Sequence, residues 1–179
     1  MQSASVIICE SERLVLRLQQ SSDVDSLVDL WTDPAVTRYL GGPRERAELQ
    51  MGFARTAEDP AAERYDLWPL VERATGRVVG HCGLLDKEVD GKTEIELVYV
   101  LARPVWGRGY ATEIAEAIIQ FASEKMGVKR LIALIEPGNV SSERVVAKLG
   151  MSLEKEVIRP GGGCRKIYAT ETGENTDAK

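Results

Sequence analysis

Seven segments of the chain carry a hydrophobic pattern that predicts β-strands. In the segment Arg13–Leu18, leucines at every second position alternate with Arg13, Val15 and Arg17, as expected for a strand with one buried face. The turn-forming segments Ala74–Arg77 and Val89–Lys92 separate three longer runs, which indicates successive hairpins. The predicted strands are Arg13–Leu18, Tyr65–Glu72, Val78–Leu85, Glu94–Leu101, Leu131–Ile135, Ser152–Ile158 and Arg165–Ala169.

Four other segments predict helices. In the third of them, Ile114, Ala117, Ile118 and Phe121 recur at helical spacing, and Gly127 fits its C-terminal end. We expect Ser21 or Ser22 to cap the first. The predicted helices are Ser21–Trp31, Arg44–Thr56, Gly109–Lys125 and Asn139–Leu149. The order of elements is strand, two helices, three strands, helix, strand, helix and two strands, which predicts an α/β fold with a mixed sheet.

Length and composition are those of one globular domain. The chain has 179 residues, of which 44% are hydrophobic and 28% charged. We expect residues 1–171 to form a single domain and the polar tail 172–179 to be disordered. There is neither a secretory signal nor an apolar run near the roughly 20 residues that a membrane helix needs, so we expect a cytoplasmic protein that does not engage a membrane.

Charge and ligand-type residues narrow the function classes further. The net charge of −5 argues against nucleic acid as a partner and favours a cationic substrate. The three cysteines (Cys9, Cys82, Cys164) are widely spaced, and His81 is the only histidine. This set predicts neither a disulfide framework nor a metal site.

The first segment with a chemical implication reads Trp-Gly-Arg-Gly-Tyr-Ala-Thr-Glu, from Trp106 to Glu113. It lies between a predicted strand and a predicted helix. Helix N-termini expose unpaired N–H groups with partial positive charge, and glycines let that backbone approach a phosphate closely. By itself the segment fits either an anion site or a tight turn with no ligand. It has no Gly-Lys-Ser/Thr of a P-loop and lacks the third glycine of a dinucleotide fingerprint.

The second segment runs from Glu136 to Met151. Asn139 or Ser141 as an N-cap, an apolar face and Gly150 as a stop explain most of it as an ordinary helix. Its residues nevertheless form a long pattern, one predicted strand and one turn after the glycine segment: Asn139-x-x-Ser142-x-Arg144-Val145-x-x-Lys148-Leu149-Gly150-Met151.

Together the two segments resemble the GNAT superfamily of acyl-CoA-dependent N-acetyltransferases, and within it the RimJ/RimL-like branch. Trp106–Glu113 matches that branch's WGxGYATE signature, and Asn139–Met151 matches NxxSxRVxxKLGF/M. The resemblance extends from Arg13 to about Thr170. It implies a GNAT-like mixed, mostly antiparallel sheet of about seven strands, flanked by about four helices, and an acetyl-CoA-dependent transfer of an acetyl group to a primary amine.

The resemblance also implies how acetyl-CoA is held. Backbone amides in the glycine segment would bind the pyrophosphate, with Thr112 close by. The strand before it would pair with the pantetheine arm like an added strand. Asn139 would bind the arm from the other side, and Arg144 or Lys148 would approach the adenosine end. The cofactor-binding residues predicted in this way are Val98, Tyr99, Val100, Gly107, Arg108, Gly109, Tyr110, Ala111, Thr112, Asn139, Ser142, Arg144 and Lys148.

Acetyl transfer needs a neutral amine, so the site must remove a proton. Glu96 matches the branch's acidic strand position and is the first candidate for the base or for an amine-binding carboxylate, ahead of Glu94; a salt-bridged strand glutamate is the alternative. The N–H of Val98 or Tyr99 would bind the oxyanion. Many family members protonate the leaving thiolate with a tyrosine after the asparagine helix. This chain has none there, so Ser142 is the catalytic candidate, with Tyr168 second. We expect His81 to be a packed strand residue.

Two rival interpretations remain open from the sequence. One is a non-catalytic acyl-CoA-binding or sensing module on the same fold, and the other is a nucleotide-binding protein unrelated to CoA. The acceptor is also open: a protein N-terminus, a polyamine and an aminoglycoside all suit the acidic chain. A homodimer is compatible with the sequence.

Overall fold

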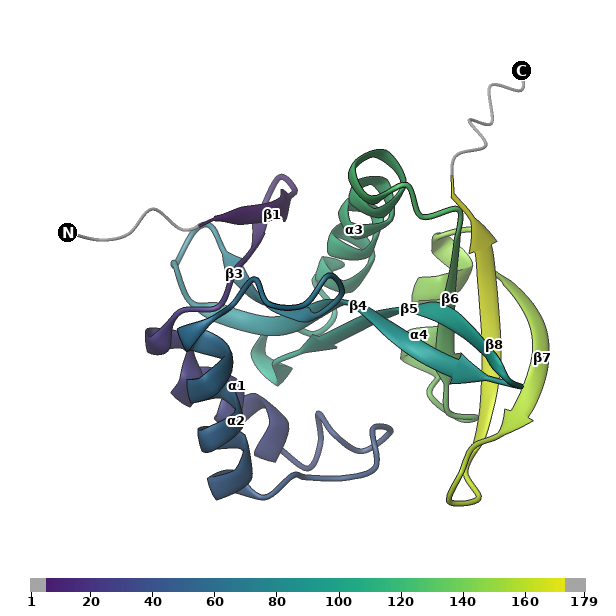
Figure 1. The fold of residues 1–179 in the computed structure, drawn as a ribbon, viewed down its shortest axis with the longest axis horizontal. Coiled ribbons are helices and arrows are strands. Elements are labelled where there is room, and N and C mark those ends of the chain that lie inside the picture. Colours follow the sequence, from purple (N-terminus) through teal and green to yellow (C-terminus); the bar gives the residue numbers. More distant parts are fainter. Residues whose placement is uncertain (1–5, 173–179) are drawn as a thin grey trace.

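The computed structural model describes residues 6–172, which form one eight-stranded sheet with four α-helices (Figure 1). The strands are β1 (Ile7–Glu10), β2 (Leu14–Arg17), β3 (Leu67–Glu72), β4 (Val78–Val89), β5 (Lys92–Leu101), β6 (Arg130–Ile135), β7 (Ser152–Ile158) and β8 (Cys164–Glu171). The helices are α1 (Val24–Thr32), α2 (Arg46–Glu58), α3 (Tyr110–Met126) and α4 (Val140–Lys148), with short 3-10 turns η1 (Ser21–Asp23) and η2 (Arg103–Val105).

The sheet order is β1-β2-β3-β4-β5-β6-β8-β7, and all neighbouring strands except β5 and β6 are antiparallel. The α/β fold with a mostly antiparallel sheet is therefore confirmed. The sheet has eight strands where about seven were predicted, and the additional strand is β1, which pairs with β2 at the sheet edge. Its sequence Ile7-Ile8-Cys9-Glu10 is short and lacks polar alternation, so the periodicity gave no signal.

Helices cover both faces of the sheet. The His81 ring packs against Trp31 of α1 and Phe53 of α2, with ring centroids 6.2 and 5.5 Å away. Its neighbour Cys82 instead belongs to the core cluster that contains Ile114 of α3. Since adjacent strand residues point to opposite faces, α1 and α2 lie on one face and α3 on the other. We call the first the α1/α2 face.

Most helix ends follow local signals. Gly127 ends α3 in the left-handed conformation, and Asn139 caps α4, both as predicted. The predicted serine cap of the first helix was wrong. Asp23, buried and held by Arg17 at 2.7 and 2.8 Å, instead accepts the backbone N–H of Gln20 at 2.7 Å. The first turn thus begins after Gln20 with a capping box, in which the Asp23 carboxylate accepts the backbone N–H of the cap residue.

The folded region extends into the predicted tail. Thr172 is buried, its N–H bonds the Lys129 carbonyl at 2.8 Å, and its hydroxyl donates to the Val128 carbonyl. Disorder was thus a wrong prediction for this residue, because a neighbouring loop satisfies its polar groups; residues 173–179 lie outside the described part. Among the helices described for residues 6–172, none has the length and apolar character needed to cross a membrane.

Candidate acetyl-CoA and acceptor site

The glycine turn between β5 and α3 has the backbone of an anion site. Gly107 and Gly109 have φ angles of +75° and +80°, a left-handed conformation that glycine adopts without steric cost. No atom lies within 4 Å of a Cβ placed on Gly107, so the turn is open above its backbone. Gly109 is the N-cap of α3 and supplies no side-chain cap, which leaves the first N–H groups of the helix for a ligand.

Trp106 fastens this turn to the strand before it. The indole N–H donates to the carbonyl of Leu101, the last residue of β5, at 2.7 Å, while half of the residue remains exposed. The tryptophan thus fixes the turn relative to β5 and also presents an apolar rim.

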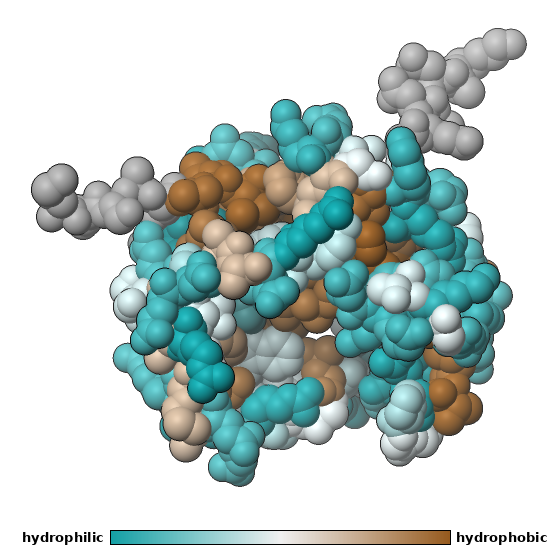
Figure 2. Space-filling model, viewed as in Figure 1, coloured by the Kyte–Doolittle hydropathy of each residue, from teal (hydrophilic) through white to brown (hydrophobic). Residues whose placement is uncertain are grey.

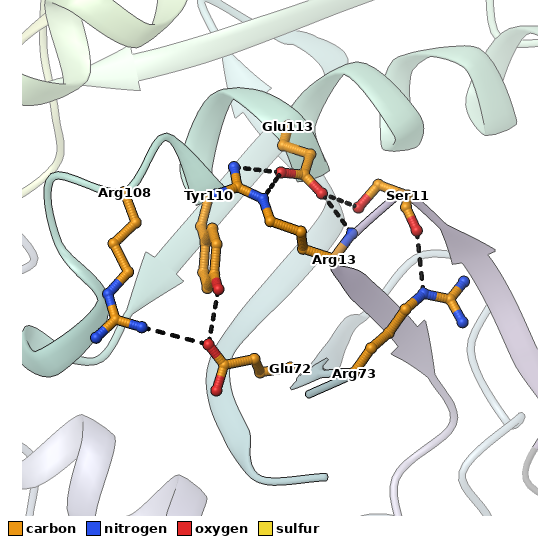
Figure 3. A network of polar contacts seen from close by, with 7 residues as sticks. All are labelled: Ser11, Arg13, Glu72, Arg73, Arg108, Tyr110 and Glu113. Atoms are coloured by element: carbon orange, nitrogen blue, oxygen red, sulfur yellow. Dashed lines mark hydrogen bonds and ion pairs between the residues drawn. The ribbon is translucent and has the colours of Figure 1, made fainter. Parts of the chain in front are cut away.

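Tyr110 anchors the start of α3 to the sheet through Glu72 at the end of β3 (Figure 3). The buried phenol donates to a Glu72 carboxylate oxygen at 2.7 Å, and an Arg108 guanidinium nitrogen lies 3.4 Å from the same oxygen. Hydrogen bonds from Tyr110 and from Thr75 lower the pKa of Glu72, so the carboxylate is charged at neutral pH. The side chain of Arg108 is half exposed and can also reach an anion at the turn.

A second carboxylate ties the first turn of α3 to the β1–β2 connection. Glu113 accepts the Ser11 hydroxyl at 2.7 Å, the Arg13 backbone N–H at 2.9 Å and the Arg13 Nε at 2.8 Å (Figure 3). The Arg13 guanidinium also lies over the Tyr110 ring, 4.6 Å from its centroid. Sequence reasoning assigned no role to Arg13, Glu72 or Glu113. The only available signal was that Glu113 ends the WGxGYATE match.

β5 and β6 are paired in the sheet at only one position in the described part of the chain, where Glu96 lies opposite Ile132. Beyond it, Val98, Tyr99 and Val100 pair with β4 on one edge only. Their other backbone edge is left without a strand partner, as an extended ligand arm would require. Figure 2 shows this face of the molecule hollowed in its middle, between the side that carries α1 and α2 and the side that carries β7 and β8.

The start of α4 lies across from β5. The Asn139 side-chain oxygen accepts the Ser142 N–H at 3.3 Å and the Ser141 hydroxyl at 2.9 Å, so the residue is a helix cap. The Tyr99 hydroxyl donates to the Ser142 carbonyl at 3.3 Å, which brings two of the predicted site residues together. Burial raises the pKa of Tyr99 to about 12, so its phenol stays protonated at neutral pH.

Arg144 and Lys148, farther along α4, are exposed. In the described part of the chain, the structure records no ion pair for either of them. Both remain able to reach a ligand that lies along α4.

Glu96 lies where β5 and β6 meet. Leu97 belongs to the core cluster under α3, so Glu96 points to the α1/α2 face. It is only 9% exposed, and its carboxylate lies 3.3 Å from the Lys87 ammonium. Burial raises the pKa of Glu96, and Lys87 opposes that shift. Glu94 instead pairs with Arg130 at 3.2 Å, consistent with its lower rank as a candidate.

Glu96 and Ser142 approach the gap between β5 and β6 from opposite faces of the sheet. Tyr99 contacts Ser142 and lies three residues after Glu96 on β5, so the two side chains point to opposite faces.

His81 lies in the packed interior, where its Nδ1 accepts the Trp31 indole N–H at 3.0 Å. Burial lowers the pKa of His81 to about 4, so the ring is neutral. The expectation of a packed strand histidine is confirmed.

Comparison with known proteins assigns the chain to a family. An acetyltransferase (GNAT) domain model matches residues 13–152, and the chain therefore belongs to the GNAT acetyltransferase family. The uncharacterized N-acetyltransferase p20 of Bacillus licheniformis is 31% identical over 150 residues, which cover 82% of either chain. Protein YkkB of Bacillus subtilis is 30% identical over 82% of this chain and 86% of its own length.

Solved structures share the fold. A GNAT-family acetyltransferase from Bacillus anthracis superposes with a TM-score of 0.77 at 22% identity, over 92% of this chain and 98% of its own. The aminoglycoside acetyltransferase AAC(6′)-Ib, solved with coenzyme A, gives a TM-score of 0.70 at 16% identity, over 88% and 94%. The protein is thus an acetyl-CoA-dependent acetyltransferase of the GNAT fold.

Proposed function

We propose that the protein transfers the acetyl group of acetyl-CoA directly to a primary amine in a ternary complex, as a RimJ/RimL-like enzyme acting on a peptide N-terminus or a small amine. The observation that carries this proposal is the buried Glu96 carboxylate, which faces the α1/α2 side where β5 and β6 part. The long match of both motifs to the RimJ/RimL-like branch supports the acceptor class.

The open glycine turn supports a pyrophosphate site made of backbone N–H groups from Gly107, Arg108, Gly109, Tyr110 and Ala111, with Thr112 beside it. The free edge of Val98, Tyr99 and Val100 would pair with the pantetheine arm. The Asn139 amide nitrogen would donate to the arm, because the capping bonds use only the side-chain oxygen. Arg144 and Lys148, both exposed on α4, would meet the adenosine end.

Glu96 would remove the proton from the acceptor ammonium, directly or through one water, because an ammonium nitrogen has no lone pair for attack. Alkyl amines have a pKa near 10.4 and α-amino groups near 7.7–8.0, so at neutral pH an alkyl amine depends most on this step. The N–H of Val98 or Tyr99 would stabilise the negative charge that develops on the thioester oxygen.

Two hydroxyl groups are candidates to hydrogen-bond the leaving thiolate. The Ser142 hydroxyl is the first, as expected from the sequence. The Tyr99 phenol is the second, because it reaches the same turn of α4 from β5 and stays protonated at neutral pH. Tyr99 would then serve in place of the family's tyrosine directly after α4, where this chain has Met151, Ser152 and Leu153.

The experiment is an amine screen. The protein is incubated with acetyl-CoA and a panel of peptides with free N-termini, polyamines and aminoglycosides, while thiol release and the mass of the products are followed. We expect saturable thiol release and an acetylated amine with at least one acceptor. Saturable acetyl-CoA binding without turnover on any amine would favour the non-catalytic acyl-CoA-binding module.

A further inference from the structure

Lys87 makes the one ion pair recorded for Glu96 in the described part of the chain. It lies on β4, two residues beyond Leu85, which is the β4 residue paired with Glu96. The two carry opposite charges 3.3 Å apart, and their side chains are 32% and 12% exposed. The Lys87 side chain is therefore more exposed to solvent than the Glu96 side chain.

A buried carboxylate needs a partner to remain charged, because burial favours the protonated form. Burial is the largest influence on the pKa of Glu96 and raises it; Lys87 opposes burial most strongly, followed by Arg159 and the Leu134 N–H. A protonated Glu96 could accept no proton from an amine. The ionisation of this carboxyl group therefore depends in part on Lys87, the cation that lies 3.3 Å from it.

The other charged groups near this position are already engaged. Arg159 donates to the Glu88 carbonyl at 2.7 Å and acts on Glu96 from farther away. Arg130 of β6 pairs with Glu94 at 3.2 Å and with Glu154 at 2.7 Å. From α1 and α2, no charged side chain is recorded as a partner of Glu96 within the residues described. Lys87 is thus the cation placed to control Glu96.

The geometry points to Lys87 as a positioning residue for acetyl transfer, one that holds the Glu96 carboxylate ionised and directed toward the acceptor on the α1/α2 face. The inference rests on the proposed role of Glu96 as the base. It assigns no contact between Lys87 and the acetyl group: the proton still passes from the acceptor ammonium to Glu96, and the thiolate still leaves with CoA.

The test compares Lys87→Met and Lys87→Arg with the control Lys155→Met. Lys155 also pairs with a carboxylate, Asp90 at 2.6 Å, but both partners are about half exposed or more. For each protein, kcat/KM is measured from acid to alkaline pH. An opposite charge within about 4–6 Å lowers the pKa of a carboxyl group by about 1–3 units. Lys87→Met should therefore shift the acid limb of the kcat/KM profile toward higher pH by at least about one pH unit.

At the acid end, Lys87→Met should therefore lose about tenfold or more in kcat/KM, and it should approach wild type at alkaline pH. Lys87→Arg should restore the profile, Lys155→Met should leave it unmoved, and all three should bind acetyl-CoA as wild type does. An unmoved acid limb in Lys87→Met would overturn the inference. If Glu96→Gln also retains full activity, the proposed function of Glu96 fails; if Glu96→Gln is inactive, only the role of Lys87 fails.

A second measurement needs no turnover. The ¹³C resonance of the Glu96 carboxyl group, assigned by its loss in Glu96→Gln, is titrated in wild type and in Lys87→Met. A higher midpoint in the variant supports the inference and an equal midpoint refutes it. If Lys87→Met is unfolded by circular dichroism, Lys87→Gln takes its place in both experiments.

Discussion

Glu96→Gln removes the charge and the basic lone pair of this side chain and keeps its shape. Glu96 is only 9% exposed, so bulk water is poorly placed to replace it as the proton acceptor. Without a base, only acceptor molecules that are already neutral can attack. At pH 7.4 that is about one in 10³ for an alkyl amine with a pKa near 10.4, and about a fifth to a third for an α-amino group with a pKa near 7.7–8.0.

The variant should therefore lose about 10³-fold in kcat with an alkyl amine at pH 7.4, equivalent to about 4 kcal/mol, and much less with a peptide N-terminus. The loss should shrink as the pH rises toward the pKa of the amine. The assay is thiol release at saturating acetyl-CoA from pH 6.5 to 10, with calorimetry to show unchanged acetyl-CoA affinity. Glu94→Gln is the matched control, because Glu94 lies on the same strand but pairs with Arg130. A defect that does not vary with pH, or none at all, would refute the role of Glu96 as base; a raised KM alone would make it an amine-binding carboxylate.

Three further predictions concern other parts of the site and the fold. Gly109→Val forces a β-branched residue to φ near +80°, so the acetyl-CoA Kd should rise at least about tenfold by calorimetry, whereas Gly91→Val, at φ +75° in the β4–β5 turn at the other end of β5, should leave it unchanged. Tyr99→Phe removes the phenol hydroxyl that donates to the Ser142 carbonyl, and in steady-state kinetics it should lower kcat about tenfold or more with little change in KM. A kcat equal to that of wild type would exclude the phenol from the reaction. The pKa of His81 in the folded protein, about 4, lies below its ordinary value of 6.5, so its contribution to stability is complete above pH 6.5 and is lost as the pH falls toward 4. In His81→Asn, the free energy of unfolding in urea should therefore fall less steeply between pH 6.5 and pH 4 than in wild type. An equal slope in both proteins would contradict this prediction.

Features that depend on local sequence were predicted well. The glycines of the β5–α3 turn, the Asn139 cap and the Gly127 stop each follow from the conformation of a few neighbouring residues. The two motifs then sufficed to predict the family, because both lie within single strand–turn–helix units.

Features that depend on distant pairing were not predictable. Tyr110 and Glu72 are 38 residues apart, and Glu113 and Arg13 are 100 apart, so no periodicity links them. The predicted strand ended at Leu85, so Lys87 lay outside it. In the structure β4 continues to Val89 because each of these residues pairs with β5. The ion pair between Lys87 and Glu96 follows from that longer hairpin.

Acetyl-CoA bound on the glycine turn should bring its thioester within reach of an amine held by Glu96. The most direct test is the distance from the CoA sulfur to the Glu96 carboxylate in a crystal structure of the complex. An amine about 3 Å from the base and about 3–3.5 Å from the carbon it attacks sets this distance at about 6–8 Å, with about 3 Å more if one water relays the proton. We predict a value in that range, with the pyrophosphate on the amides of residues 107–111. A distance from the CoA sulfur to the Glu96 carboxylate above that range, or a pyrophosphate bound elsewhere, would contradict this arrangement of the site.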